Sequence, residues 1–144
     1  PVGEVFHGGT FAGHPLSMVA GAATLRELNA HPPYERLERL THRLAEGLVK
    51  VAAEAGVPVQ VNWLGSMLTV FFSQTPVRCF THAKAAHRER FARWARALQA
   101  EGILIPPSPM EAMFLSTAHT RTHIDRVVDA SRRAFAALRR QEEG

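Results

Sequence analysis

Two adjacent prolines, Pro32 and Pro33, separate two helical patterns whose apolar residues are arranged differently. Residues 16–29, before the prolines, are apolar on nearly every side, so we expect this helix to need burial on several sides. Residues 34–55, after them, carry a single apolar stripe, which is typical of an amphipathic helix with one buried face. The stripe consists of Leu37, Leu40, Leu44, Leu48 and Val51. Because prolines interrupt helices, the sequence predicts two units, residues 1–30 and residues 31–144.

The second unit alternates between helical and extended patterns. We expect, in chain order, strands over 57–61 and 67–72, a loop over 74–82, a helix over 87–100, short strands over 103–105 and 113–116, and a last helix that Thr120 or Thr122 caps. The third helix should bury Phe91, Trp94, Ala95 and Leu98. This order predicts an α+β fold, in which helices pack on one face of a small, mostly antiparallel sheet of three to four strands, preceded by an interdomain helix.

Composition and charge exclude several classes of protein. No apolar run approaches the length that spans a membrane. The single cysteine, Cys79, excludes an internal disulfide and favours a reducing compartment such as the cytoplasm. The net charge is +4, but the arginines of residues 35–46 alternate with glutamates, as on a solvated, ion-paired helix face. We therefore expect neither nucleic acid nor a membrane as a partner.

A glycine-rich segment at residues 7–16 is the first candidate binding site. Gly8, Gly9 and Gly13 surround Thr10, and glycines allow the backbone to approach a phosphate closely while N–H groups and a hydroxyl donate hydrogen bonds. The spacing matches neither a Walker A loop nor a Rossmann fingerprint. A plain glycine-rich turn that leads into a helix therefore remains the alternative interpretation.

Glu111 is the second candidate, because it is the only acidic residue in the proline-rich stretch 105–114. A carboxylate in such apolar surroundings is either a structural group with its own partners or an acid placed for function. The histidines do not offer a metal site. His119 and His123 are four residues apart, but no third ligand accompanies them.

Four stretches together resemble a known family. They are residues 9–18 (GTFAGHPLSM), 65–72, 101–112 with its Pro-Ser-Pro-Met-Glu-Ala ending, and 115–125 with Ser-Thr-Ala-His-Thr. Their order and spacing are similar to the C-terminal part of the fold-type I, class III pyridoxal phosphate (PLP) aminotransferases. The pair Glu111-Ala112 and the stretch 118–120 resemble the glutamate-1-semialdehyde aminomutase subgroup in particular.

The resemblance implies a PLP-dependent homodimer that isomerises glutamate-1-semialdehyde to 5-aminolevulinate in tetrapyrrole biosynthesis. Gly9 and Thr10 match the family segment that binds the cofactor phosphate across the dimer interface. Glu111 matches a glutamate that faces the active site. Related aminotransferases place an arginine there to bind a substrate carboxylate, whereas an acid would repel that group and favour an aldehyde.

The lysines of the chain indicate which part of such an enzyme it contains. PLP enzymes bind the cofactor through a lysine, and the two lysines here, Lys50 and Lys84, do not lie in a context that resembles the family's lysine motif. We therefore expect a C-terminal fragment, inactive by itself. Residues 1–30 would be the tail of the large PLP-binding domain with its connecting helix, and residues 31–144 the small domain. Two alternatives remain: another class III aminotransferase that acts on an ω-amine or amino acid, or a non-enzymatic module that binds a partner through the helix over 16–29.

Overall fold

The computed structural model describes residues 3–5 and 8–143. It divides the chain into two compact units, Pro1–Pro33 and Tyr34–Gly144. The first unit contains α1 (Pro15–Ala30), which begins with a proline at its first position, where the ring's fixed φ suits a helix and no N–H is needed. No residue of α1 is buried within the described part of the chain, and Leu16 and Leu25 are exposed.

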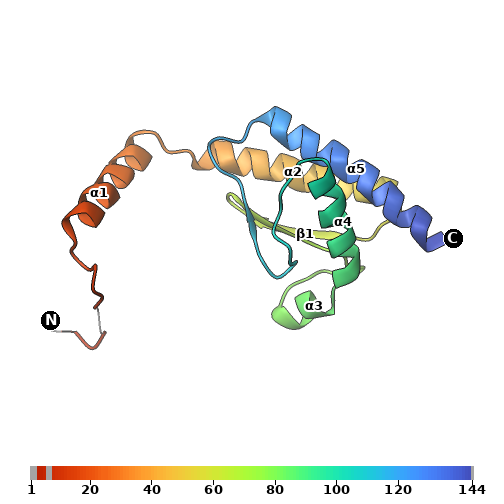
Figure 1. The fold of residues 1–144 in the computed structure, drawn as a ribbon, viewed down its shortest axis with the longest axis horizontal. Coiled ribbons are helices and arrows are strands. Elements are labelled where there is room, and N and C mark those ends of the chain that lie inside the picture. Colours follow the sequence, from red (N-terminus) through yellow and green to blue (C-terminus); the bar gives the residue numbers. More distant parts are fainter. Residues whose placement is uncertain (1–2, 6–7, 144) are drawn as a thin grey trace. The chain divides into compact units, whose positions relative to one another are not determined.

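The second unit is a three-stranded antiparallel sheet covered by three long helices. The strands β1 (Gln60–Leu64), β2 (Met67–Phe71) and β3 (Met113–Phe114) lie in the order β1-β2-β3. The long helices are α2 (Tyr34–Glu54), α4 (Arg88–Ala100) and α5 (Arg121–Glu143). Figure 1 shows α2 and α5 running side by side over the sheet. The α+β fold expected from the sequence is confirmed.

The core lies between the sheet and the helices. Alternate residues of β2, Leu68 and Val70, are buried against the helices, and they pair with Trp63 and Val61 of β1. At the centre, the ring of Trp94 stacks on that of Phe135, with 6.0 Å between the ring centroids. Its Nε1–H donates to the hydroxyl of Ser131 at 3.2 Å, so both buried polar groups are satisfied.

The sequence placed one strand where the chain forms a helix end. Residues 103–105 are not a strand, because Gly102, at φ +75°, ends α4 in a Schellman motif. The N–H of Ile103 donates to the carbonyl of Leu98 at 3.0 Å and is therefore not available to a sheet. The strand expected over 113–116 is shorter, because it pairs with β2 only through Met113 and Phe114.

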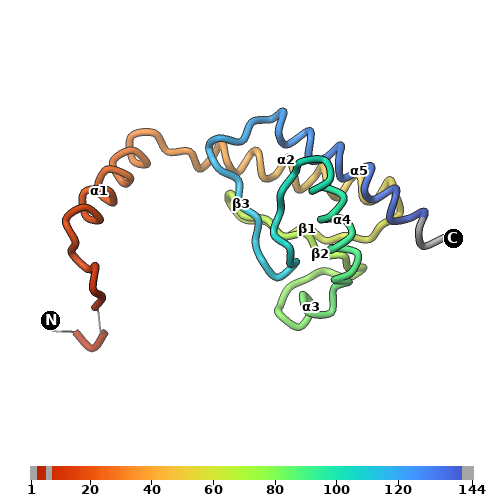
Figure 2. The backbone as a smooth tube through the Cα atoms, viewed as in Figure 1, coloured from red at the N-terminus to blue at the C-terminus, as the bar shows by residue number. Residues whose placement is uncertain are grey.

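Two further boundaries differ from expectation. β1 begins at Gln60 rather than at residue 57, since Pro58 has no N–H for the ladder. The predicted loop over 74–82 runs into a short helix, α3 (Phe80–Ala85). Ala83 of α3 joins Phe71, Val77 and Ala86 in a small cluster. Because Phe71 points away from Val70, this cluster lies on the other side of the sheet, where Figure 2 draws α3.

Candidate functional site

The Gly9–Thr10 segment forms two consecutive turns ahead of α1. The N–H of Ala12 donates to the carbonyl of Gly9 at 2.9 Å, and the N–H of His14 donates to that of Phe11 at 3.1 Å. Gly13 adopts φ +76°, which the second turn requires and which few residues other than glycine adopt. Gly9 and Thr10 are exposed, and a Cβ added at Gly9 would meet nothing within 4 Å.

This turn fits one side of a phosphate site. An exposed hydroxyl and an unobstructed glycine backbone are neutral hydrogen-bond donors of the kind that contact phosphate oxygens. The sequence has no lysine or arginine before Arg26, so the turn itself supplies no positive side chain. Gly9 and Thr10 therefore fit one part of a PLP phosphate site in which other groups balance the negative charge of the phosphate.

Glu111 lies on the turn that precedes β3. Its N–H donates to the carbonyl of Ser108 at 3.2 Å, and the N–H of Met110 donates to the Ser108 hydroxyl at the same distance. The side chain of Glu111 is exposed, and no hydrogen bond or ion pair engages its carboxylate within the described residues. The functional role of Glu111 stays a prediction.

The two candidate groups belong to different units. Gly9 and Thr10 lie in Pro1–Pro33, and Glu111 lies in Tyr34–Gly144. Their participation in one site therefore stays a prediction. Lys50 on α2 and Lys84 on α3 are both exposed.

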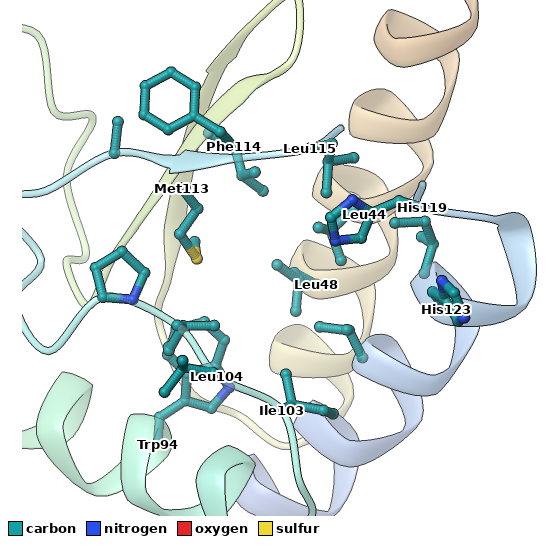
Figure 3. Close-up of a pocket in the computed structure, with 16 residues that line it drawn as sticks. Leu44, Leu48, Trp94, Ile103, Leu104, Met113, Phe114, Leu115, His119 and His123 are labelled. Atoms are coloured by element: carbon teal, nitrogen blue, oxygen red, sulfur yellow. The ribbon is translucent and has the colours of Figure 1, made fainter. Parts of the chain in front are cut away.

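A cavity of about 270 Å³ opens beside β3 (Figure 3). Its wall is apolar apart from His119 and His123, and it includes Leu44, Leu48, Trp94, Ile103, Met113 and Leu115. Glu111 does not line it, although the next residue, Ala112, does. Lys50 and Lys84 are also absent from its wall.

The two histidines have local structural roles that the sequence did not reveal. Nδ1 of His119 accepts from the N–H of Ser116 at 3.0 Å and lies 3.1 Å from its hydroxyl. Nδ1 of His123 accepts from the N–H of Thr120 at 3.4 Å, while the Thr120 hydroxyl accepts from the N–H of His123 at 3.3 Å. Thr120 and His123 therefore cap the start of α5 reciprocally. Among the residues that the structure describes, no group of three or more possible ligands could hold a metal ion.

An exposed ion pair joins α2 to α5 next to these turns. Nε of Arg43 donates to Oδ1 of Asp125 at 2.7 Å. This hydrogen bond, more than the accompanying Coulomb attraction from Arg43, lowers the pKa of the Asp125 carboxyl. Arg121 contributes in the same direction.

The lowered pKa predicts a pH dependence of stability. A carboxyl whose pKa is lower in the folded state contributes stability above its unfolded pKa of about 3.9, and loses it as pH falls through the folded pKa. The free energy of unfolding should fall as the pH is lowered, partly because Asp125 becomes protonated. We expect this fall to be smaller in Asp125→Asn, while the part that comes from other groups remains. Urea titrations of both proteins between pH 2 and pH 6 measure it. Parallel curves for the two proteins would contradict the assignment.

No helix within the described residues is long and apolar enough to cross a membrane.

A comparison of this chain with known proteins identifies the class to which it belongs. A family model described as Aminotransferase class-III matches residues 1–134. The chain belongs to the class III aminotransferases, a PLP-dependent family. The resemblance found in the sequence is confirmed.

Individual proteins of this family are similar to the chain in sequence or in structure. Glutamate-1-semialdehyde 2,1-aminomutase of Desulfosudis oleivorans is 49% identical over 138 residues, which is 96% of this chain and 32% of that protein. An omega-transaminase from Sphaerobacter thermophilus is similar in structure, with TM-score 0.72, 32% identity, and coverage of 91% of this chain and 30% of that one. The FumI protein of Sphingopyxis sp. MTA144, solved in a PLP-containing form, gives TM-score 0.74, 26% identity, and coverage of 98% and 31%. The chain spans about a third of the length of the curated relatives it matches.

Proposed function

We propose that this chain is the C-terminal part of a PLP-dependent aminomutase that converts glutamate-1-semialdehyde to 5-aminolevulinate. It would act as a cytoplasmic homodimer and would be inactive without the rest of the enzyme. Similarity to the Desulfosudis aminomutase over 96% of the chain supports the assignment. The structural observation that carries it is the exposed carboxylate of Glu111, which lacks a partner within the described residues.

Gly9 and Thr10 are proposed to bind the cofactor phosphate across the dimer interface. When bound, PLP supplies an electrophilic carbonyl for amines and an electron-withdrawing ring that stabilises negative charge beside the exchanged nitrogen. The chain's part is to bind and orient. The Thr10 hydroxyl and the backbone N–H groups beside Gly9 would donate hydrogen bonds to phosphate oxygens, and glycine keeps the approach open.

Glu111 is proposed to select the substrate by charge. A fixed negative charge repels a substrate carboxylate at that end of the site, while an uncharged aldehyde or an ammonium group is accepted. This favours a substrate with an aldehyde where amino acids carry their α-carboxylate. The exposed Glu111 can make this contact without losing an existing ion pair.

We further propose that neither lysine of the chain binds the cofactor covalently, because neither lies in a sequence context that resembles the family's lysine motif. Lys50 lies on the exposed face of α2, which packs its other face into the core, and Lys84 lies on the short helix α3. The lysine would therefore come from the remainder of the enzyme.

A chimera tests the proposal directly. The segment of the Desulfosudis aminomutase that aligns with this chain is replaced by the chain, and the product is mixed with PLP and glutamate-1-semialdehyde without an amino donor. We expect 5-aminolevulinate to form. The 144-residue chain alone, with PLP, should form none, because neither of its lysines lies in a context that resembles the family's lysine motif.

Variants of the chimera test the two residues. Glu111→Gln should lower kcat/KM for glutamate-1-semialdehyde by about tenfold or more, and Thr10→Val should mainly weaken PLP retention. Glu35→Gln, on an exposed face of α2, is the matched control for Glu111. A chimera that needs an amino donor and releases a keto acid would instead favour an ω-aminotransferase, in line with the similarity to the Sphaerobacter enzyme. A folded chimera with neither activity would contradict both assignments.

A further inference from the structure

A concave surface in the second unit gathers four arginines. It lies between the first half of α2 and the start of α5, has a volume of about 490 Å³, and is called here the arginine hollow. It is lined by Arg36, Arg39, Leu40, Arg43, Thr120 and Arg121. The α2 members are spaced by three and four residues, which places them on one helix face.

Two of these arginines are already held in place. The guanidinium of Arg36 donates to the carbonyl oxygens of Thr117 at 3.1 Å and His119 at 3.0 Å. Both acceptors are neutral, so Arg36 keeps its full positive charge. Arg43 is fixed by its hydrogen bond to Asp125. Arginines fixed in this way lose little side-chain entropy when a ligand binds.

The carboxylates around the hollow do not balance its charge. Asp125 pairs with Arg43, and Glu35 lies 3.5 Å from Arg39 in an exposed pair that water screens strongly. Within the described residues, no ion pair to a carboxylate engages Arg36 or Arg121. The hollow therefore carries an excess of two positive charges.

The pairing of α2 with the start of α5 explains why the sequence did not reveal this surface. Glu38 and Glu46 alternate with the arginines along the chain, which suggested a neutralised, solvated face. In the folded helix neither glutamate lines the hollow. Glu38 falls on another side of α2 by the helical period, and Glu46 shares the face of Arg39 and Arg43 but comes three residues after Arg43, the last α2 residue of the hollow.

We propose that the arginine hollow is a binding site for a small phosphate compound that carries two or more negative charges. Guanidinium groups match phosphate oxygens in geometry and retain their charge at every physiological pH. The first turn of α5 contains no acidic residue that would compete for the arginines. The site uses none of the residues proposed for the cofactor or for substrate selection.

Inorganic pyrophosphate is the probe for the test. It is titrated into the 144-residue chain in a low-chloride buffer, with calorimetry for affinity and backbone amide chemical shifts for location. We expect saturable binding of one pyrophosphate per chain, with the largest shifts at residues 36–43 and 117–125. Absence of saturation up to about 10 mM, or shifts centred elsewhere, would overturn the proposal.

Charge-matched variants separate a built site from general attraction. Arg39→Gln combined with Arg121→Gln should weaken binding at least tenfold, because it removes two hollow arginines and leaves the contacts of Arg36 and Arg43 intact. Arg88→Gln combined with Arg96→Gln removes the same charge from exposed positions on α4 and should leave the affinity within twofold. Circular dichroism confirms that both variants fold. Equal weakening in the two double variants would show that net charge alone attracts the anion, and would refute the site.

Discussion

Trp94→Ala is expected to remove a large fraction of the stability of the second unit. Trp94 is only 1% exposed and its ring contacts those of Phe72, Phe91 and Phe135. Truncating such a side chain costs about 3–5 kcal/mol, since it leaves a cavity. The buried hydroxyl of Ser131 also loses its donor. Domains of this size are stable by about 5–15 kcal/mol, so the loss is a large fraction of the total. Urea unfolding followed by far-ultraviolet circular dichroism measures it.

The other tryptophan provides the control. Trp63 on β1 is 37% exposed, and its ring lies 5.3 Å from that of His42 on α2. We expect Trp63→Ala to cost about 1 kcal/mol, as is usual for a partly exposed site. If the two variants shifted the unfolding midpoint equally, the core would not be centred on the stacked Trp94 and Phe135.

Gly47→Ala is expected to destabilise the chain although alanine favours helices. A Cβ at Gly47 on α2 would lie 2.6 Å from Cγ2 of Val128 on α5, closer than real Cβ atoms approach. Either the Val128 side chain or the two helices would have to shift, and overpacking of this kind typically costs about 1–3 kcal/mol. This exceeds the gain of about 1 kcal/mol that alanine brings over glycine within a helix. Urea unfolding at neutral pH is the measurement.

A double-mutant cycle assigns the effect to the contact. Val128→Ala removes the methyl groups that meet the new Cβ, so Gly47→Ala should cost less in that background than in the wild type. Gly21→Ala on α1, where a Cβ would meet nothing within 4 Å, is the matched glycine control and should not destabilise. Stabilisation by Gly47→Ala in the wild-type background would contradict the close packing of α2 on α5.

The apolar patterns of the long helices predicted the fold well. Leu40, Leu44 and Leu48 of α2 are buried, as is Trp94 of α4. Each of these helices buries one face, and the spacing of its apolar residues identifies that face. The predicted elements were wrong where backbone hydrogen bonds, rather than burial of apolar residues, determine the local structure. Ile103 looked like the start of a strand, but its N–H caps α4. The close approach at Gly47 depends on where α5 crosses α2, which no local pattern contains.

The candidate site was predictable only in parts. The glycine-rich turn at Gly9 and the acid at Glu111 stood out because their residue types are unusual in their surroundings. Whether they act together depends on contacts beyond either unit, which no residue pattern specifies. The arginine hollow was not predicted, because it needs Arg121 of α5 to lie beside α2, and no local pattern contains that contact.

The shortness of β3 affects how firmly the stretch before it is joined to the sheet. β3 pairs with β2 at only two positions, Met67↔Phe114 and Leu68↔Met113. The adjoining proline-rich stretch that carries Glu111 is therefore tied to the sheet by few ladder bonds, while the stacked aromatic core is built by α4 and α5. We therefore expect substitutions at exposed positions of this stretch, such as Glu111, to change the stability of the domain little, as is general for loops carried on a rigid scaffold.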